Sequence, residues 1–108
     1  GGKGEHVVSP IAVDDHMMLY RPPASVCNEF ELEKITVNAE GYTILPSKYS
    51  SILLITENSC KYKCNHDEWT EINDGSVHFL PAQSSVELIA LKTNSTIVWR
   101  AHVNSEQL

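Results

Sequence analysis

Short alternating runs of apolar and polar residues fill the chain from Phe30 onward. In Ser59–Cys64 the two cysteines and the tyrosine fall on one side, and the two lysines fall on the other. Strict alternation of this kind is typical of a β-strand with one buried face. Seven further runs, each bounded by turn residues, are also predicted to be strands: Phe30–Val37, Tyr42–Leu45, Ser51–Thr56, Glu68–Ile72, Ser76–Leu80, Val86–Leu91 and Thr96–Val103.

Three of these runs have features that bear on the fold. Phe30–Val37 loses its alternation after Leu32, and a β-bulge would explain the phase slip. Ser51–Thr56 contains four consecutive apolar residues, which favours a strand buried on both faces. In Thr96–Val103, Trp99 shares a face with other apolar residues, so we expect this face to contact the core.

No segment has a convincing helical period, so the pattern predicts an all-β fold. Seven to eight short antiparallel strands must bury their apolar rows against one another, which indicates a sandwich or barrel. The first residues are glycine-rich and lack periodicity. We therefore expect an irregular arm or linker over residues 1–18 and one β-domain over residues 19–108.

Composition and charge exclude several classes of protein. The 108 residues suit one domain, and 14 acidic against 8 basic side chains give a net charge of −6. A nucleic-acid surface is not expected, because phosphate binding requires clustered Lys and Arg. The longest apolar run, Ile52–Ile55, is far shorter than the roughly 20 residues that span a bilayer. Three cysteines, Cys27, Cys60 and Cys64, fit no disulfide framework and indicate free thiols in the cytoplasm.

Gly75–Pro81 consists of a glycine, five residues and a proline, and it resembles the second conserved motif of the cupin fold. From Leu19 to Val103 the chain is similar to the C-terminal domain of class I mannose-6-phosphate isomerases. The resemblance implies a cupin-like jelly roll. The residues that carry it are Tyr20-Arg-Pro-Pro23, Glu29-Phe30, Ser50–Leu54, Gly75–Pro81 with Ala82, Val86–Leu88 and Trp99–Ala101.

The resemblance also implies a role for the chain. These isomerases interconvert mannose 6-phosphate and fructose 6-phosphate with a zinc ion, held by a glutamine, a glutamate and two histidines upstream of the matching region. We therefore expect no catalytic, cofactor-binding or metal-binding residue in this chain, and zinc only in the parent enzyme. The expected partner is the catalytic N-terminal part of the same enzyme. We expect the sugar phosphate to bind only to the parent enzyme and not to this chain alone.

A cupin metal site of the chain's own is not expected either. Aligning the first cupin motif places its ligand glutamate at Ser51, and no histidine occurs in the preceding segment from Tyr42 to Ser50. In the second motif the ligand histidine falls on Val86. The site would need two histidines and a glutamate from the first motif and a histidine from the second. None of these four ligands is present at its position, and the valine side chain cannot ligate a metal.

A rival zinc site would combine Cys60, Cys64 and His66 with His78 or His102 as fourth ligand. Four residues along a strand span about 13 Å, too far for one ion, so core thiols are the preferred interpretation.

Other polar residues favour structural roles. His102 and Arg100 share the polar face of the last strand, and a strand arginine commonly pairs with an acid, here Glu87 or another on a neighbouring strand. The histidines, including His6 and His16, are expected to be surface or hydrogen-bonded residues. Asp14-Asp15 beside His16 lies in the expected arm, where a catalytic geometry would not be held.

Three functions remain open from the sequence. The first is a non-catalytic domain that supports the isomerase, with Met17, Met18 and Leu19 as apolar contacts to the rest of the enzyme. The second is a free-standing module without metal that binds carbohydrate or protein, with Trp69 and Trp99 as stacking surfaces. The third, a small cupin metalloenzyme, conflicts with the residues at Ser51 and Val86.

Overall fold

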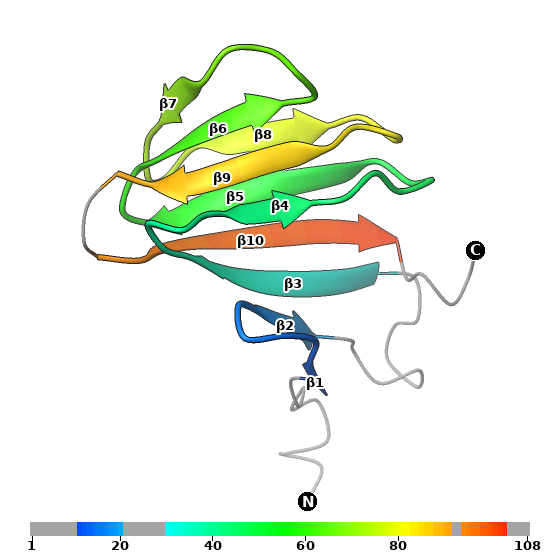
Figure 1. Cartoon of the computed structure of the whole chain (residues 1–108). Helices are drawn as coiled ribbons and strands as arrows, with labels where there is room; N and C mark the ends of the chain where they lie inside the picture. Colours follow the sequence, from blue (N-terminus) through cyan, green and yellow to red (C-terminus); the bar gives the residue numbers. More distant parts are fainter. Residues whose placement is uncertain (1–10, 21–29, 92–93, 104–108) are drawn as a thin grey trace, which may run out of the picture.

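In the part of the chain that the structure describes, ten antiparallel strands form two sheets (Figure 1). The computed structural model describes residues 11–20, 30–91 and 94–103, and none of these residues forms a helix, let alone one that could cross a lipid bilayer. The larger sheet has the strand order β1-β2-β3-β10-β5-β8, and the smaller has β4-β9-β6-β7. The all-β class is confirmed, with more strands than the seven to eight expected. Their bounds are β1 Ile11–Ala12, β2 Met17–Tyr20, β3 Phe30–Val37, β4 Tyr42–Ile44, β5 Ser51–Glu57, β6 Cys60–Cys64, β7 Thr70–Ile72, β8 Val77–Leu80, β9 Val86–Ala90 and β10 Thr96–Val103.

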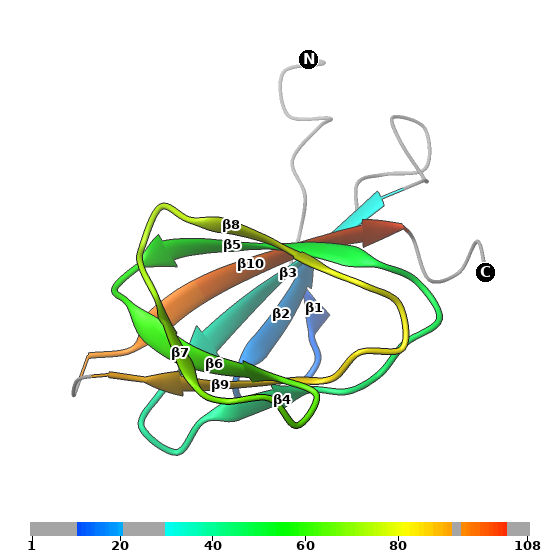
Figure 2. The same ribbon diagram turned by 90° about the horizontal axis from the view of Figure 1, so that it is seen from above.

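The two sheets stand as opposite walls with the core between them (Figure 2). Each strand presents alternate side chains to the interior, as its pleat requires. The most deeply buried apolar side chains come from both walls, which identifies one continuous core. They include Ile35, Val37, Leu53, Ile55 and Val98 from the larger sheet and Cys60, Val86 and Leu88 from the smaller.

The N-terminal described residues extend the larger sheet. β1 pairs with β2, and β2 pairs with β3, placing Met17 opposite Ile35. The expected irregular arm is therefore wrong for residues 11–12 and 17–18, while residues 1–10 lie outside the described residues. Strands of two and four residues are too short to produce a recognisable alternation.

β5 and β3 both differ from the patterns expected from the sequence. In each strand, inward residues are buried and outward residues are more exposed, whatever their polarity. In β5, Leu53 is buried whereas Ile52 and Leu54 are 46% and 37% exposed, so the strand is not buried on both faces. β3 pairs with β10 in unbroken register, without the expected bulge. The phase slip arises because Glu31 and Glu33 occupy inward positions that apolar residues usually fill.

β10 presents the opposite face to the one expected. Arg100 and His102 point inward and are 6% and 5% exposed, whereas Trp99 lies on the outer face beside Tyr20, with ring centroids 5.3 Å apart. The prediction that Trp99 contacts the core is therefore wrong. The pattern of a single strand predicts that polar residues face solvent. Here Arg100 and His102 face the interior because they form hydrogen bonds with residues of β3 and β5.

Two glycines allow turns that other residues would strain. Gly75 has φ 85° and precedes β8, but the turn joins β7 of the smaller sheet to β8 of the larger and is not a hairpin. Gly41, with φ 89°, lies between β3 and β4, and a Cβ there would sit 2.9 Å from the Leu88 carbonyl oxygen. At Gly75 no atom lies within 4 Å of such a Cβ.

We expect Gly41→Ala to destabilise the fold more than Gly75→Ala. Both alanines would have to adopt a positive φ, at about 1–2 kcal/mol, and only Gly41→Ala adds a clash with backbone. Urea unfolding of the two variants measures the difference, with Gly75→Ala as the matched control. Equal losses would mean that the close approach to Leu88 is relieved without cost.

Candidate functional site

Charged side chains occupy the interior at one end of the larger sheet. Two inward rows cross β3, β10 and β5 there, as the strand register shows. One row aligns Glu31, His102 and Ser51, and the next aligns Glu33 with Arg100. All five residues are buried. The sheet interior therefore changes from apolar at one end to ionic at the other.

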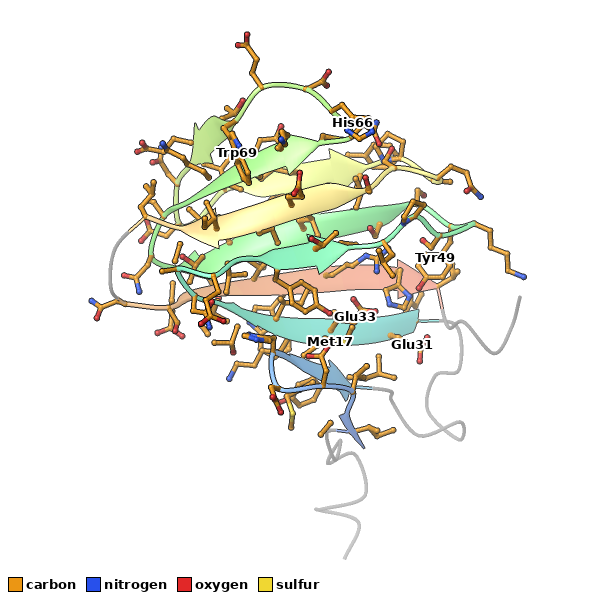
Figure 3. The ribbon with its side chains drawn as sticks, in the orientation of Figure 1. Met17, Glu31, Glu33, Tyr49, His66 and Trp69 are labelled. Atoms are coloured by element: carbon orange, nitrogen blue, oxygen red, sulfur yellow. The ribbon has the colours of Figure 1, made fainter. Side chains whose placement is uncertain are left out.

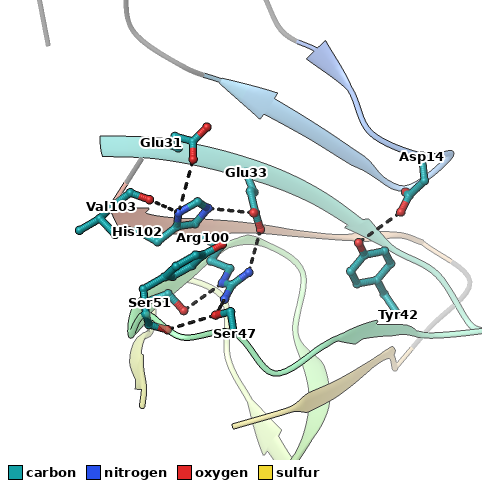
Figure 4. Close-up of polar contacts among 10 residues, drawn as sticks. Asp14, Glu31, Glu33, Tyr42, Ser47, Ser51, Arg100, His102 and Val103 are labelled. Atoms are coloured by element: carbon teal, nitrogen blue, oxygen red, sulfur yellow. Dashed lines mark hydrogen bonds and ion pairs between the residues drawn. The ribbon is translucent and has the colours of Figure 1, made fainter. Parts of the chain in front are cut away.

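Arg100 holds this end together through three side chains from different segments (Figure 4). Its Nε donates to Ser51 Oγ at 2.9 Å, and its Nη2 donates to Ser47 Oγ at 3.2 Å. Nη1 donates to Glu33 Oε1 at 3.3 Å. The expected acidic partner on a neighbouring strand is thus Glu33 of β3, whereas Glu87 forms an ion pair with Lys63 at 3.6 Å.

His102 continues the network on the other side of Glu33. Nε2 lies 2.8 Å from Glu33 Oε2, and Nδ1 lies 2.6 Å from the Val103 carbonyl oxygen. Glu31 Oε1 lies 3.9 Å from Nδ1. Both ring nitrogens thus face oxygen acceptors, and a ring that carries both protons can donate to each.

Tyr49 covers the network from the loop before β5. Its ring stacks on His102 with centroids 4.5 Å apart, and the Arg100 guanidinium carbon lies 5.3 Å from the ring centroid. Burial, more than any other cause, raises the pKa of Tyr49. An ordinary tyrosine has a pKa near 10, so this phenol is neutral near pH 7 with or without the rise.

A cleft of about 340 Å³ opens beside the network. Its apolar lining comes from Met17, Ile44 and Leu45. Charged and hydroxyl-bearing groups from five segments converge on the same space, namely Asp14, Glu33, Tyr42, Thr43, Ser47, Tyr49 and Arg100. A cavity of this size with a few convergent polar groups is typical of a small-molecule site.

Asp14 orders the rim of the cleft. Its Oδ1 accepts the backbone N–H of His16 at 2.7 Å and that of Met17 at 2.8 Å. Tyr42 donates its hydroxyl to Asp14 Oδ2 at 3.3 Å. Burial, followed by the Asp14 carboxylate, raises the pKa of Tyr42 to about 12. Asp14 is therefore a turn residue that also anchors a cleft tyrosine, and it is not paired with the His16 ring.

The positions that would hold a cupin metal do not fit one. Val86 is a buried aliphatic residue of β9, and Ser51 accepts a hydrogen bond from Arg100. Among the residues that the structure describes, no group of three or more His, Cys, Asp or Glu side chains could hold a metal ion.

The cysteine-based zinc site is not assembled either. Cys60 and Cys64 are free thiols at opposite ends of β6, and burial raises the pKa of Cys60 to about 11. Zinc binds thiolates, so a buried thiol that resists ionisation is a poor ligand. Figure 3 shows His66 and Trp69 well away from Glu31, Glu33 and Tyr49. Cys27 and His6 lie outside the described residues.

The other residues considered from the sequence have structural contacts. His78 Nε2 lies 2.8 Å from Ser76 Oγ, and His16 Nδ1 lies 3.1 Å from the Thr36 carbonyl oxygen. Trp69 is 43% exposed, with Lys63 Nζ 5.2 Å from its ring centroid.

Sequence reasoning did not identify the cleft. The phase slip, which arises because Glu31 and Glu33 share the inward face of β3 with Ile35, was the available signal.

Solved structures with the same arrangement come from several organisms. An RmlC-like cupin of Methanocaldococcus jannaschii matches with a TM-score of 0.70 and 10% identity, over 95% of this chain and 94% of that one. The chain has a cupin fold. An RmlC-like cupin of Shewanella frigidimarina (TM-score 0.66, 11% identity, 93% and 86% covered) and KdgF of a Halomonas species (0.63, 11%, 98% and 96%) also match. No family model and no curated protein matches the sequence.

We expect Arg100→Leu to lower the free energy of unfolding by about 3–5 kcal/mol, because it leaves Glu33 charged and buried without its guanidinium partner. The double variant Arg100→Leu/Glu33→Gln should lose less, since it removes both charges. Urea unfolding at pH 7 of both variants and of Glu33→Gln completes a double-mutant cycle. Additive losses would contradict a coupled ion pair.

Proposed function

We propose that this chain is the non-catalytic C-terminal β-domain of a zinc-dependent mannose-6-phosphate isomerase. The segments that carry the resemblance are central strands of the fold. Ser51–Leu54 lies in β5, Val86–Leu88 in β9 and Trp99–Ala101 in β10. The cupin fold agrees with this assignment, and the parent enzyme would supply the zinc site.

The chemistry of the interior supports a role without catalysis by this domain alone. Val86 and Ser51 replace the metal ligands that the fold would otherwise offer at these positions. We therefore assign the sugar phosphate and zinc to the remainder of the enzyme.

The outer face of the larger sheet carries the proposal. Strand register aligns Leu32, Ala101, Ile52 and Phe79 in one row across four strands. The next row aligns Lys34, Trp99, Leu54 and Val77, and its only charged member is the lysine. Monomeric proteins rarely expose contiguous apolar patches larger than a few hundred Å², and larger patches mark interfaces. We call these two rows the outer apolar face.

Phe79 and Val77 are the most exposed members of this face, at 68% and 62%. Of the contacts expected from the sequence, Met17 packs against the core, whereas Met18 lies opposite Lys34 of β3 and so extends the outer apolar face. We therefore assign contact with the catalytic part to the outer apolar face.

A free-standing binding module is the second candidate. The cleft beside Arg100 and Glu33 favours it, because this space is lined by convergent polar groups and lies apart from the outer apolar face. The two candidates differ in whether a catalytic part is covalently attached.

The test is an isomerase assay with mannose 6-phosphate and zinc on the natural gene product that contains these residues. We expect turnover by the gene product and none by residues 1–108 alone. In the gene product, Phe79→Asn should lower the unfolding temperature by a few degrees, because a buried aromatic contact is lost. Trp69→Asn replaces an exposed aromatic residue just before β7, away from the outer apolar face, and should change the unfolding temperature little.

Two results would contradict this proposal. One is a gene product without isomerase activity, and the other is turnover by residues 1–108 alone. Equal effects of Phe79→Asn and Trp69→Asn would remove the outer apolar face as the contact surface.

A further inference from the structure

The ionic network and the cleft share Ser47 and the ion pair of Arg100 and Glu33. Burying such a pair is not needed for stability, because replacing a buried ion pair by apolar residues is often neutral or stabilising. A supporting domain could fill this end of the interior with aliphatic side chains, as it does around Ile35 and Val98. Charges retained next to a cleft therefore point to a ligand that they contact.

The paired groups offer a donor and an acceptor side by side. Arg100 is only a donor, and an ionised Glu33 is only an acceptor, with Nη1 and Oε1 separated by 3.3 Å. A hydroxyl group both donates and accepts, so adjacent hydroxyls on one ligand can bond to both residues. Ser47 and Tyr42 add further hydroxyl groups to the same space.

Charges of both signs surround the cleft. The Arg100 guanidinium faces two carboxylates, Glu33 and Asp14, and Glu33 also bonds to the His102 ring. The two tyrosines present neutral hydroxyl groups, and burial raises the pKa of both. A phosphate ester would meet the two carboxylates, and a cationic amine would meet the guanidinium. A neutral ligand avoids both penalties.

The size and the walls of the cleft fit a small ring. Its volume of about 340 Å³ lies at the lower end of the range for small-molecule sites. Met17, Ile44 and Leu45 provide apolar walls for the C–H surfaces of such a ligand.

We propose that this cleft binds a neutral polyhydroxylated molecule of monosaccharide size, held by Arg100 and Glu33 through adjacent hydroxyl groups. Tyr42, fixed by its bond to Asp14, positions the ligand from the rim. This site is distinct from the outer apolar face and does not depend on attachment to an isomerase.

The experiment is a ¹⁵N NMR titration of residues 1–108 with D-mannose, a neutral hexose with adjacent hydroxyls. We expect shifts of amide signals around Tyr42, Thr43 and Ser47, with a Kd in the millimolar range. Mannose 6-phosphate, which adds only the anionic group, should bind at least tenfold more weakly.

A pair of variants tests the cleft itself. Tyr42→Phe keeps the ring and removes the hydroxyl, so we expect mannose to bind about three- to tenfold more weakly. Tyr62→Phe makes the same change on β6, outside the cleft lining, and should bind like the parent chain.

Three outcomes would overturn the assignment. They are unchanged cleft amides, tighter binding of the phosphate ester than of mannose, and equal behaviour of the two tyrosine variants. None of them bears on whether the gene product is an isomerase, because the titration uses the isolated chain.

Discussion

The ion pair between Arg100 and Glu33 is the interaction on which this end of the fold depends. Its members lie 67 residues apart in sequence and face each other across β3 and β10. Glu33 also contacts His102, and Arg100 also donates to Ser51 and Ser47. Because Arg100, Glu33 and His102 are buried, removing one of them leaves a charged or polar partner in the interior with fewer hydrogen bonds. The network therefore fixes β3, β5 and β10 relative to one another.

The larger sheet has apolar residues on both faces, and only one of them meets the smaller sheet. Its inner face combines the ionic rows with the apolar core, while its outer face exposes Phe79 and Val77. In the proposed attachment, the outer face would meet the catalytic part, which leaves the cleft beside Arg100 available. The proposed attachment to a catalytic part and the proposed ligand thus use different surfaces of one fold.

The sequence was sufficient for the fold class and most strands, because alternation in segments such as Ser59–Cys64 reports one buried face. It was insufficient where tertiary partners reverse the usual rule. Glu33 and Arg100 face the interior because they form an ion pair once β3 and β10 meet. Since side chains alternate along β10, the neighbouring Trp99 then faces outward. A pattern read along one strand cannot detect a partner on another. The short pair β1 and β2 was missed because two to four residues carry no measurable period.

Little of the site was predictable. From the motif spacing we expected Ser51 and Val86 in place of metal ligands, and the structure buries both side chains. The absence of a metal site stays a prediction. The cleft could not be predicted, since Asp14, Tyr42 and Arg100 come together only through the fold. The phase slip at Glu31 and Glu33, interpreted as a bulge, was in fact the sign of this site.

The most direct test of the buried network is the Nε–H signal of Arg100 in a ¹⁵N NMR spectrum, assigned by its loss in Arg100→Lys. The account predicts a sharp signal that exchanges slowly with solvent and shows a nuclear Overhauser effect to the Ser51 side chain, because Nε donates to Ser51 Oγ at 2.9 Å. A signal broadened by rapid exchange, without contact to Ser51, would show that the guanidinium is solvated, which contradicts the account.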